Sequence, residues 1–72
     1  MADFTFEIIE HICVLKTGND GWKKELSLVS WNGSDAKYDI REWNGDYTKM
    51  TRGITLTPDE AHHIVKAIES RV

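Results

Sequence analysis

The chain has 72 residues and a formal net charge of −3 at pH 7, which predicts one domain over residues 1–72 with a core of marginal size. Its 40% hydrophobic and 29% charged residues exclude wholesale disorder, and no apolar run is long enough to span a membrane. The N-terminus lacks the basic and apolar regions of a signal peptide, and the single cysteine excludes an internal disulfide. We therefore expect a cytoplasmic protein in a reducing compartment.

The stretch from Phe4 to Lys16 predicts the first strand, because it is rich in β-branched and aromatic residues. Apolar residues occupy both parities of this strand, which indicates a strand covered on both of its faces. One helix can cover only one face of so small a sheet. A second copy of the chain is the expected cover for the other face, so we predict a homodimer.

Residues 17–21 (TGNDG) predict a turn, because asparagine, aspartate and glycine tolerate the backbone values that a chain reversal requires. A second strand is predicted over residues 22–31, a loop over residues 32–36 and a third strand over residues 37–43. Closing this loop as a hairpin pairs the two strands in an antiparallel register.

We expect Trp31 to lie opposite Lys37, which also places Glu25 opposite Trp43. One face, expected to be open to solvent, then carries Lys23, Trp31, Lys37, Arg41 and Trp43. The other face, expected to be the core side, carries Leu26, Leu28, Tyr38 and Ile40. The offset from Lys37 to Trp43 separates the two indoles by roughly 20 Å along the strand. That span suits a stretched chain of a few units better than one small molecule.

A turn at Asn44-Gly45 leads into a fourth strand, predicted over residues 47–56, with Ile54 and Leu56 turned inward. Gly53 indicates a bulge or a close approach of two backbones. The sequence then starts a helix with Thr57 as N-cap, Pro58 at the first helical position and Glu60 completing a capping box. The apolar stripe of this helix, which we expect to pack on the core side, is Ala61, Ile64, Val65, Ile68 and Val72.

Catalysis is not expected. No Ser-His-Asp or Cys-His pair has a spacing that local structure would bring together, although pairing of distant residues stays open, and no glycine-rich phosphate loop precedes a helix. His11 and Cys13 are expected on one strand face, but a closed metal site needs further ligands. We predict no metal, no cofactor and no small-molecule substrate.

The aromatic and basic face has two interpretations. In the first, the tryptophans cap the ends of the sheet and the lysines keep the protein soluble. In the second, the face is a stacking platform on which aromatic rings accept bases of any sequence while cations follow the phosphates. The net charge does not decide between them, because binding follows the local field, and the middle of the chain has a slight basic bias.

Two linked segments bear on this choice. Residues 39–43 (DIREW), followed by residues 52–58 (RGITLTP), resemble the signature of the positive cofactor four family. The members of this family are transcriptional coactivators whose domain binds single-stranded DNA. The resemblance covers the chain from about Trp22 to the end. It implies a curved antiparallel sheet, one C-terminal helix, and a homodimer with paired DNA-binding channels.

The resemblance also implies roles for individual residues at matching positions of this sequence. Arg41 matches the strand arginine of the family, Trp43 falls at its aromatic pair, and Trp31 falls at an aromatic that stacks on a base. Arg52 matches the lysine before the glycine. Met50-Thr51 replaces part of a more basic run, so phosphate contacts are expected from Lys23, Lys24, Lys37 and Lys49. The acidic, Ser-rich tail of the animal members is absent here, as it is in the short bacterial members.

We therefore predict an α+β protomer (ββββα) that dimerises and binds single-stranded DNA without sequence preference and without catalysis. The predicted DNA-binding residues are Lys23, Lys24, Trp31, Lys37, Arg41, Trp43, Lys49 and Arg52. A cytoplasmic, nucleoid-associated role in transcription regulation or DNA maintenance follows. Two alternatives stay open: an RNA-binding protein, and a protein-interaction module that pairs its exposed first strand with a partner.

Overall fold

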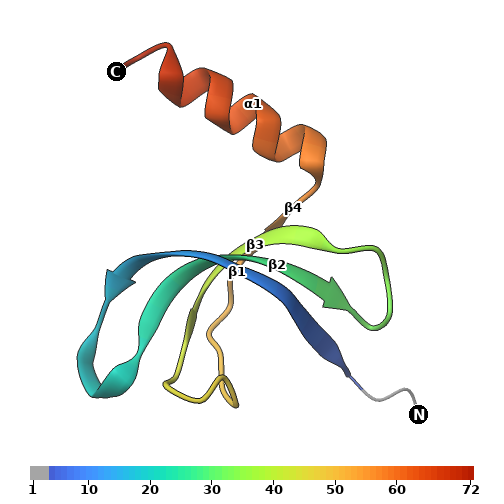
Figure 1. Ribbon diagram of the computed structural model, residues 1–72, viewed down its shortest axis with the longest axis vertical. Helices are drawn as coiled ribbons and strands as arrows, with labels where there is room; N and C mark the ends of the chain where they lie inside the picture. Colours follow the sequence, from blue (N-terminus) through green and yellow to red (C-terminus); the bar gives the residue numbers. More distant parts are fainter. Residues whose placement is uncertain (1–3) are drawn as a thin grey trace.

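A computed structural model describes residues 4–72. The elements follow in the order β1 (Phe6–Thr17), a short 3-10 turn (Asn19–Gly21), β2 (Lys23–Trp31), β3 (Lys37–Trp43), β4 (Ile54–Leu56) and α1 (Pro58–Glu69). The strands form one antiparallel sheet in the order β1-β2-β3-β4. Figure 1 shows the sheet arched, with α1 standing above its convex side. The predicted fold class, four antiparallel strands followed by one C-terminal helix, is confirmed.

The first strand begins two residues later than predicted and contains three irregularities in its pairing with β2. The register shifts between Ile8 and Glu10, between His11 and Cys13, and again before Lys16. An extra residue at each shift bends a strand and increases its twist. The long β1 is therefore bent, and as an edge strand of the sheet it follows the arch that Figure 1 shows.

The β2–β3 hairpin has a register two residues away from the predicted one. Lys37 pairs with Val29 instead of Trp31, and Trp43 pairs with Lys23. The reason lies at the end of β2, where Trp31 pairs with Phe6 of β1 and the chain then turns through Ser34. Because the register differs by an even number of residues, every side chain of β2 and β3 stays on the face that the sequence predicted.

The roles of the two faces are nevertheless reversed, which corrects the prediction. The face expected to be open is the concave face, and it holds the most buried side chains of the described chain: Glu25, Ser27, Val29, Asp39 and Trp43, each at most 1% exposed. The expected core side, with Leu26 and Tyr38, is the convex face and is only half-buried. Curvature explains the exchange, because arched strands bring side chains together on the inside and spread them apart on the outside.

The predicted fourth strand is mostly loop. Only residues 54–56 form β4, paired with Tyr38, Asp39 and Ile40, and one isolated bridge joins Met50 to Trp43. Leu56 is half-buried, as its predicted inward orientation requires. Ile54 is 60% exposed, so the prediction that Ile54 turns inward was wrong. The close backbone approach at Gly53 is confirmed, because a Cβ there would lie 2.5 Å from the carbonyl oxygen of Ile40.

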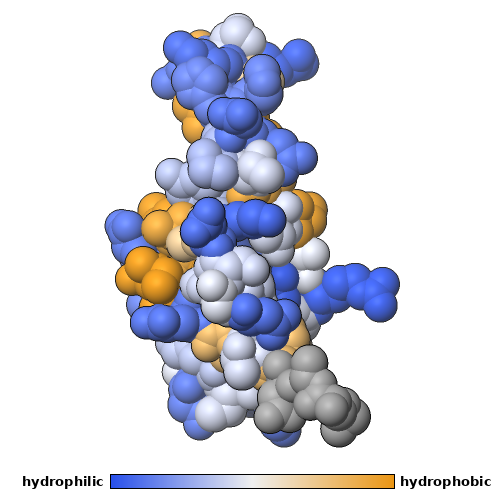
Figure 2. Space-filling model, turned by 90° about the vertical axis from the view of Figure 1, so that its right-hand side faces the viewer, coloured by the Kyte–Doolittle hydropathy of each residue, from blue (hydrophilic) through white to orange (hydrophobic). Residues whose placement is uncertain are grey.

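The helix begins as predicted. The Thr57 side chain accepts a hydrogen bond from the Glu60 backbone, and the Glu60 carboxylate accepts one from the Thr57 backbone. The packing of the apolar stripe was predicted wrongly: only Ala61 is half-buried, while Ile64, Val65 and Ile68 are 42%, 51% and 57% exposed. Figure 2 shows apolar side chains at the surface where the helix leaves the sheet.

Candidate nucleic-acid interface

A row of aromatic rings lines the concave face. Its members are, in order, Phe4, Trp31, Phe6, Trp43 and Tyr47, with successive ring centroids 5.7, 5.8, 5.3 and 5.7 Å apart. This aromatic row joins the two tryptophans through Phe6. The two indoles therefore lie much closer together than the roughly 20 Å expected from a straight strand, because Phe6 touches both.

Exposure varies strongly along the aromatic row. Phe4 is 63% exposed, whereas Trp43 is fully buried between Phe6 and Tyr47. Trp31 is half-buried. The expectation that Trp43 is presented to solvent is therefore wrong. Among the described residues, the buried indole N–H groups of Trp31 and Trp43 have no hydrogen-bond partner.

Two asparagines hold the aromatic row in place, and each follows a tryptophan in the repeated Trp-Asn-Gly tripeptide. Asn32 accepts a hydrogen bond from the Thr5 backbone at 2.8 Å and donates its own backbone N–H to the Thr5 carbonyl at 2.8 Å. Asn44 makes the equivalent pair of bonds to the backbone of Lys49. The first clamp brings the β1 end to Trp31, and the second shapes the loop that brings Tyr47 to Trp43.

Arg41 stacks on the aromatic row without being a free cation. Its guanidinium donates two hydrogen bonds to the buried Asp39 carboxylate, at 2.6 and 2.8 Å, and lies 4.4 Å from the Trp31 ring centroid. A further N–H contacts the sulfur of Met50 and the Thr51 carbonyl. Arg41 therefore orients Trp31 and neutralises Asp39, and only part of its hydrogen-bonding capacity is left for a ligand.

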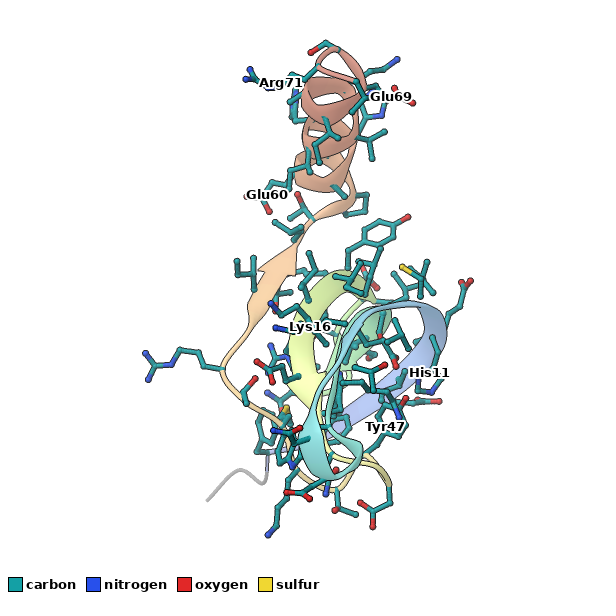
Figure 3. All side chains as sticks on the ribbon, turned by 90° about the vertical axis from the view of Figure 1, so that its left-hand side faces the viewer. His11, Lys16, Tyr47, Glu60, Glu69 and Arg71 are labelled. Carbon is teal, nitrogen blue, oxygen red and sulfur yellow. The ribbon has the colours of Figure 1, made fainter. Side chains whose placement is uncertain are left out.

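The other end of the aromatic row rests on a buried carboxylate. Glu25 accepts hydrogen bonds from Ser27 at 2.5 Å and Tyr47 at 2.7 Å, and its contact with His11 Nδ1 is 2.5 Å. Burial acts to raise the pKa of Glu25, but these hydrogen bonds together lower it below its ordinary value. Burial and the bond to Glu25 raise the pKa of Tyr47. Figure 3 shows His11 and Tyr47 side by side at this end.

The predicted site residues are only partly brought together. Lys23, Trp31, Lys37, Arg41 and Trp43 share the concave face, as predicted from parity. The Lys23 ammonium lies 4.4 Å from the Tyr47 ring centroid. Lys24 is on the convex side of β2, opposite Glu42, and Lys49 and Arg52 are exposed in the loop before β4.

The sequence prediction missed four side chains of the concave face: Phe4, Phe6, His11 and Tyr47. The two phenylalanines shared a parity that could have assigned them to the face of the tryptophans. Nothing in the sequence could have assigned His11 to the concave face, because one register shift precedes it in β1 and another directly follows it. The left-handed backbone of Tyr47 (φ 61°) also belongs to a loop that was predicted as a strand.

The pair considered for a metal is split. His11 pairs with Ser27 on the concave side, whereas Cys13 pairs with Leu26 on the convex side, so the two side chains do not share a face. The intervening register shift at Ile12 is the reason. Within residues 4–72, no group of three or more potential ligands is arranged to hold a metal ion.

The fold and this face together define a small α+β protein with one arched antiparallel sheet and an aromatic concave side. Residues 18–67 match the family described as transcriptional coactivator p15 (PC4), and the chain belongs to this family. The family is non-enzymatic and DNA-binding, which points to nucleic-acid binding and a coactivator-like role. The matched range begins after β1, so Phe4, Phe6 and His11 lie outside it.

The chain is also similar to an uncharacterized protein of Treponema pallidum (strain Nichols). The two are 47% identical over 58 residues, which cover 81% of this chain and 68% of the relative. In the described part of this chain, no helix has the length and apolar character needed to cross a membrane.

Gly53→Ala tests how closely the loop before β4 is packed under Arg41. The new Cβ would collide with the Arg41 Cβ and lie 2.5 Å from the Ile40 carbonyl oxygen. We expect a loss of about 1–3 kcal/mol of unfolding free energy, measured in urea. Gly45→Ala is the control, because its nearest neighbour is the Gly21 carbonyl oxygen at 3.9 Å. Equal stability of the two variants would contradict the close approach.

The pKa of Glu25 predicts a pH dependence of stability. Because the folded-state pKa lies below the ordinary value of 4.5, the contribution of this carboxylate is fully present above pH 4.5. It is lost as the pH falls through the lower folded-state pKa. The unfolding free energy of Glu25→Gln should therefore fall less steeply than that of the parent in acid.

Urea unfolding at a series of pH values below 4.5 checks this expectation. Glu10→Gln removes an exposed carboxylate of β1 and serves as the control for the loss of one charge. If Glu25→Gln and the parent lose stability in parallel, the hydrogen bonds to Glu25 do not stabilise the folded state.

Proposed function

We propose that this protein binds single-stranded DNA without sequence preference, on the concave face, and serves transcription regulation or DNA maintenance. The observation that carries the proposal is the aromatic row flanked by cations on one face of the sheet. Membership of a DNA-binding coactivator family supports it. Aromatic rings stack on bases of any sequence, and basic side chains follow the backbone, which together suit a single strand.

Duplex DNA fits this face poorly. The bases of a duplex are already stacked on one another and present only their edges, whereas a ring can stack only on an unpaired base. RNA is the second candidate, because stacking and phosphate contacts distinguish the two polymers weakly. Competition between DNA and RNA oligonucleotides of equal length separates these two candidates.

The structure suggests different roles within the eight proposed residues. Trp31 is the tryptophan that can reach a base, because Trp43 is fully buried and can only support the face from below. Arg41 orients Trp31 and offers its remaining N–H capacity to a phosphate. The proposed phosphate contacts of the concave face are Lys23 and Lys37 in the strands and Lys49 and Arg52 in the loop before β4, none of which makes an ion pair within residues 4–72. Lys24 lies on the convex side, so we do not propose it as a contact of this face. We propose no catalysis, metal or cofactor.

We also propose that the working form is a homodimer joined through the convex side. A groove of about 400 Å³ lies between α1 and the convex face, lined by apolar side chains that include Leu26, Tyr38, Leu56 and Val65. The exposed helix stripe borders this groove. A two-fold axis places the same patch of both copies in contact, so the stripe of one helix can cover the groove of the other. The apolar chemistry of both surfaces favours this occupant.

Binding to oligo-dT tests the proposed function. Trp31→Ala should lower affinity at every salt concentration by about 1–3 kcal/mol. Lys37→Ala should instead reduce the slope of log affinity against log salt by about 0.7 for one lost phosphate contact. Fluorescence anisotropy of a labelled oligonucleotide from low to high salt gives both quantities, and a duplex of equal length should bind weakly.

The control for Lys37→Ala is Arg71→Ala, which removes a cation beyond the end of α1, far from the concave face (Figure 3). It should leave the slope unchanged. If the parent binds oligo-dT no better than duplex, or if Trp31→Ala binds as tightly as the parent, the concave face is not a single-strand site.

The dimer is tested by a charge on the helix stripe. Ile68→Glu alters a side chain that is 57% exposed in the protomer, so it should leave the protomer contacts intact but prevent association. The apparent melting temperature of the parent should rise with protein concentration, and that of the variant should not. His63→Glu, on the opposite side of α1, is the control. Sedimentation showing that the parent is monomeric at micromolar concentration would refute the dimer.

A further inference from the structure

We propose that Phe4 is a base-stacking residue, so that the single-strand site extends beyond residues 18–67 onto the segment that leads into β1. This inference rests on the proposed function and names one further contact within the same site. It concerns a side chain outside the family match. Three observations carry it: the position of Phe4 in the aromatic row, its exposure, and the clamp that fixes its backbone.

The position of Phe4 makes it the end of a stack. Its ring centroid lies 5.7 Å from that of Trp31, at an interplanar angle of 35°, and 6.2 Å from that of Phe6. These distances are typical of interacting aromatic pairs. Trp31 and Phe6 therefore contact one part of the Phe4 ring, and the rest of that ring is open to a ligand.

Exposure separates Phe4 from the other rings of the row. It is 63% exposed, whereas Trp43 is fully buried and Trp31 already has the Arg41 guanidinium 4.4 Å from its ring centroid. A base that approaches the Trp31 end of the concave face therefore finds its largest accessible aromatic surface on Phe4. A phenyl ring stacks on a base without regard to sequence, as the proposed function requires.

The backbone clamp means that Phe4 is held at this position before a ligand arrives. The Thr5 N–H donates to the Asn32 side chain, and the Asn32 N–H donates to the Thr5 carbonyl, both at 2.8 Å. Asn32 adopts a left-handed backbone (φ 50°) to do so. An aromatic side chain on a fixed backbone loses less entropy on binding than one on a mobile segment.

Cations at the same end of the face favour a nucleic acid over an apolar partner. Lys37 is exposed and pairs with Val29, two residues before Trp31 on the same face. Arg41 lies on Trp31 itself. An exposed ring with basic neighbours offers stacking and phosphate contacts together, which is the combination that a nucleotide uses.

The experiment compares Phe4→Ala with the parent on two ligands: oligo-dT, and an abasic oligonucleotide of the same length and phosphate count. Loss of one stacking contact should weaken oligo-dT binding by about 5- to 150-fold. The salt slope should stay unchanged, because no phosphate contact is lost. Binding of the abasic oligonucleotide should be equal for the two proteins.

Two further variants separate stacking from simple apolar cover of Trp31. Phe4→Leu keeps the apolar bulk but has no ring, so it should bind oligo-dT as weakly as Phe4→Ala. Phe4→Trp keeps a ring and should bind at least as tightly as the parent. Melting temperatures of all three should stay near that of the parent, since the side chain is mostly exposed.

The outcomes are distinct. Full oligo-dT affinity in Phe4→Ala or in Phe4→Leu, or an equal loss on the abasic ligand, overturns the role of Phe4 and leaves the proposed function standing. Failure of the parent itself to bind oligo-dT overturns both. Photocrosslinking with 5-iodouracil-substituted oligo-dT gives an independent readout, and adducts confined to peptides without Phe4 also overturn its role.

Discussion

The packing of Phe6 between Trp31 and Trp43 is the interaction on which the concave face depends. Phe6 comes from β1, and the tryptophans come from the ends of β2 and β3, so one ring ties three strands together. Aromatic contacts of this kind add about 0.5–1.5 kcal/mol per pair beyond the area that they bury. They also require a curved sheet, because Phe6 pairs with Trp31 at one end of β2 while Trp43 pairs with Lys23 at the other end. The register shifts of β1 supply that bend.

Two buried carboxylates organise the hydrogen bonds of the same face. Glu25 and Asp39 are each at most 1% exposed, and a buried carboxylate is costly unless donors surround it. Ser27, His11 and Tyr47 supply the donors for Glu25, while Arg41 and Thr55 supply those for Asp39. These bonds fix the groups around Trp31 and Tyr47, so the aromatic row is oriented by charges beneath it. The concave face thus holds the core of the described residues, with two buried carboxylates in it, and is not a solvated sheet surface.

The sequence predicted the parts of this architecture that depend on neighbours along the chain. The capping box at Thr57 is local chemistry, and side-chain parity in β2 and β3 follows from backbone geometry, so both agree with the structure. The burial of each face was not predictable, because it depends on the curvature of the sheet. This curvature follows from three register shifts in β1, and no residue type in β1 indicates where they occur. The same shifts separated His11 from Cys13 and brought His11 to Glu25. The eight proposed binding residues were chosen by parity and resemblance, and their individual roles depend on exposure, which only the folded chain reveals.

The concave face and α1 lie on opposite sides of one sheet (Figure 1). A ligand on the concave side therefore leaves the helix uncovered, and association through the helix leaves the concave side open. In the proposed dimer, two equivalent copies of the proposed single-strand site would be available to one long strand. Engagement of the first site raises the effective concentration of the strand at the second, and the gain in avidity depends on whether the linking nucleotides can span the gap. Short oligonucleotides should consequently underestimate the affinity for long strands, and the arch of the sheet sets the minimum length at which both sites are filled.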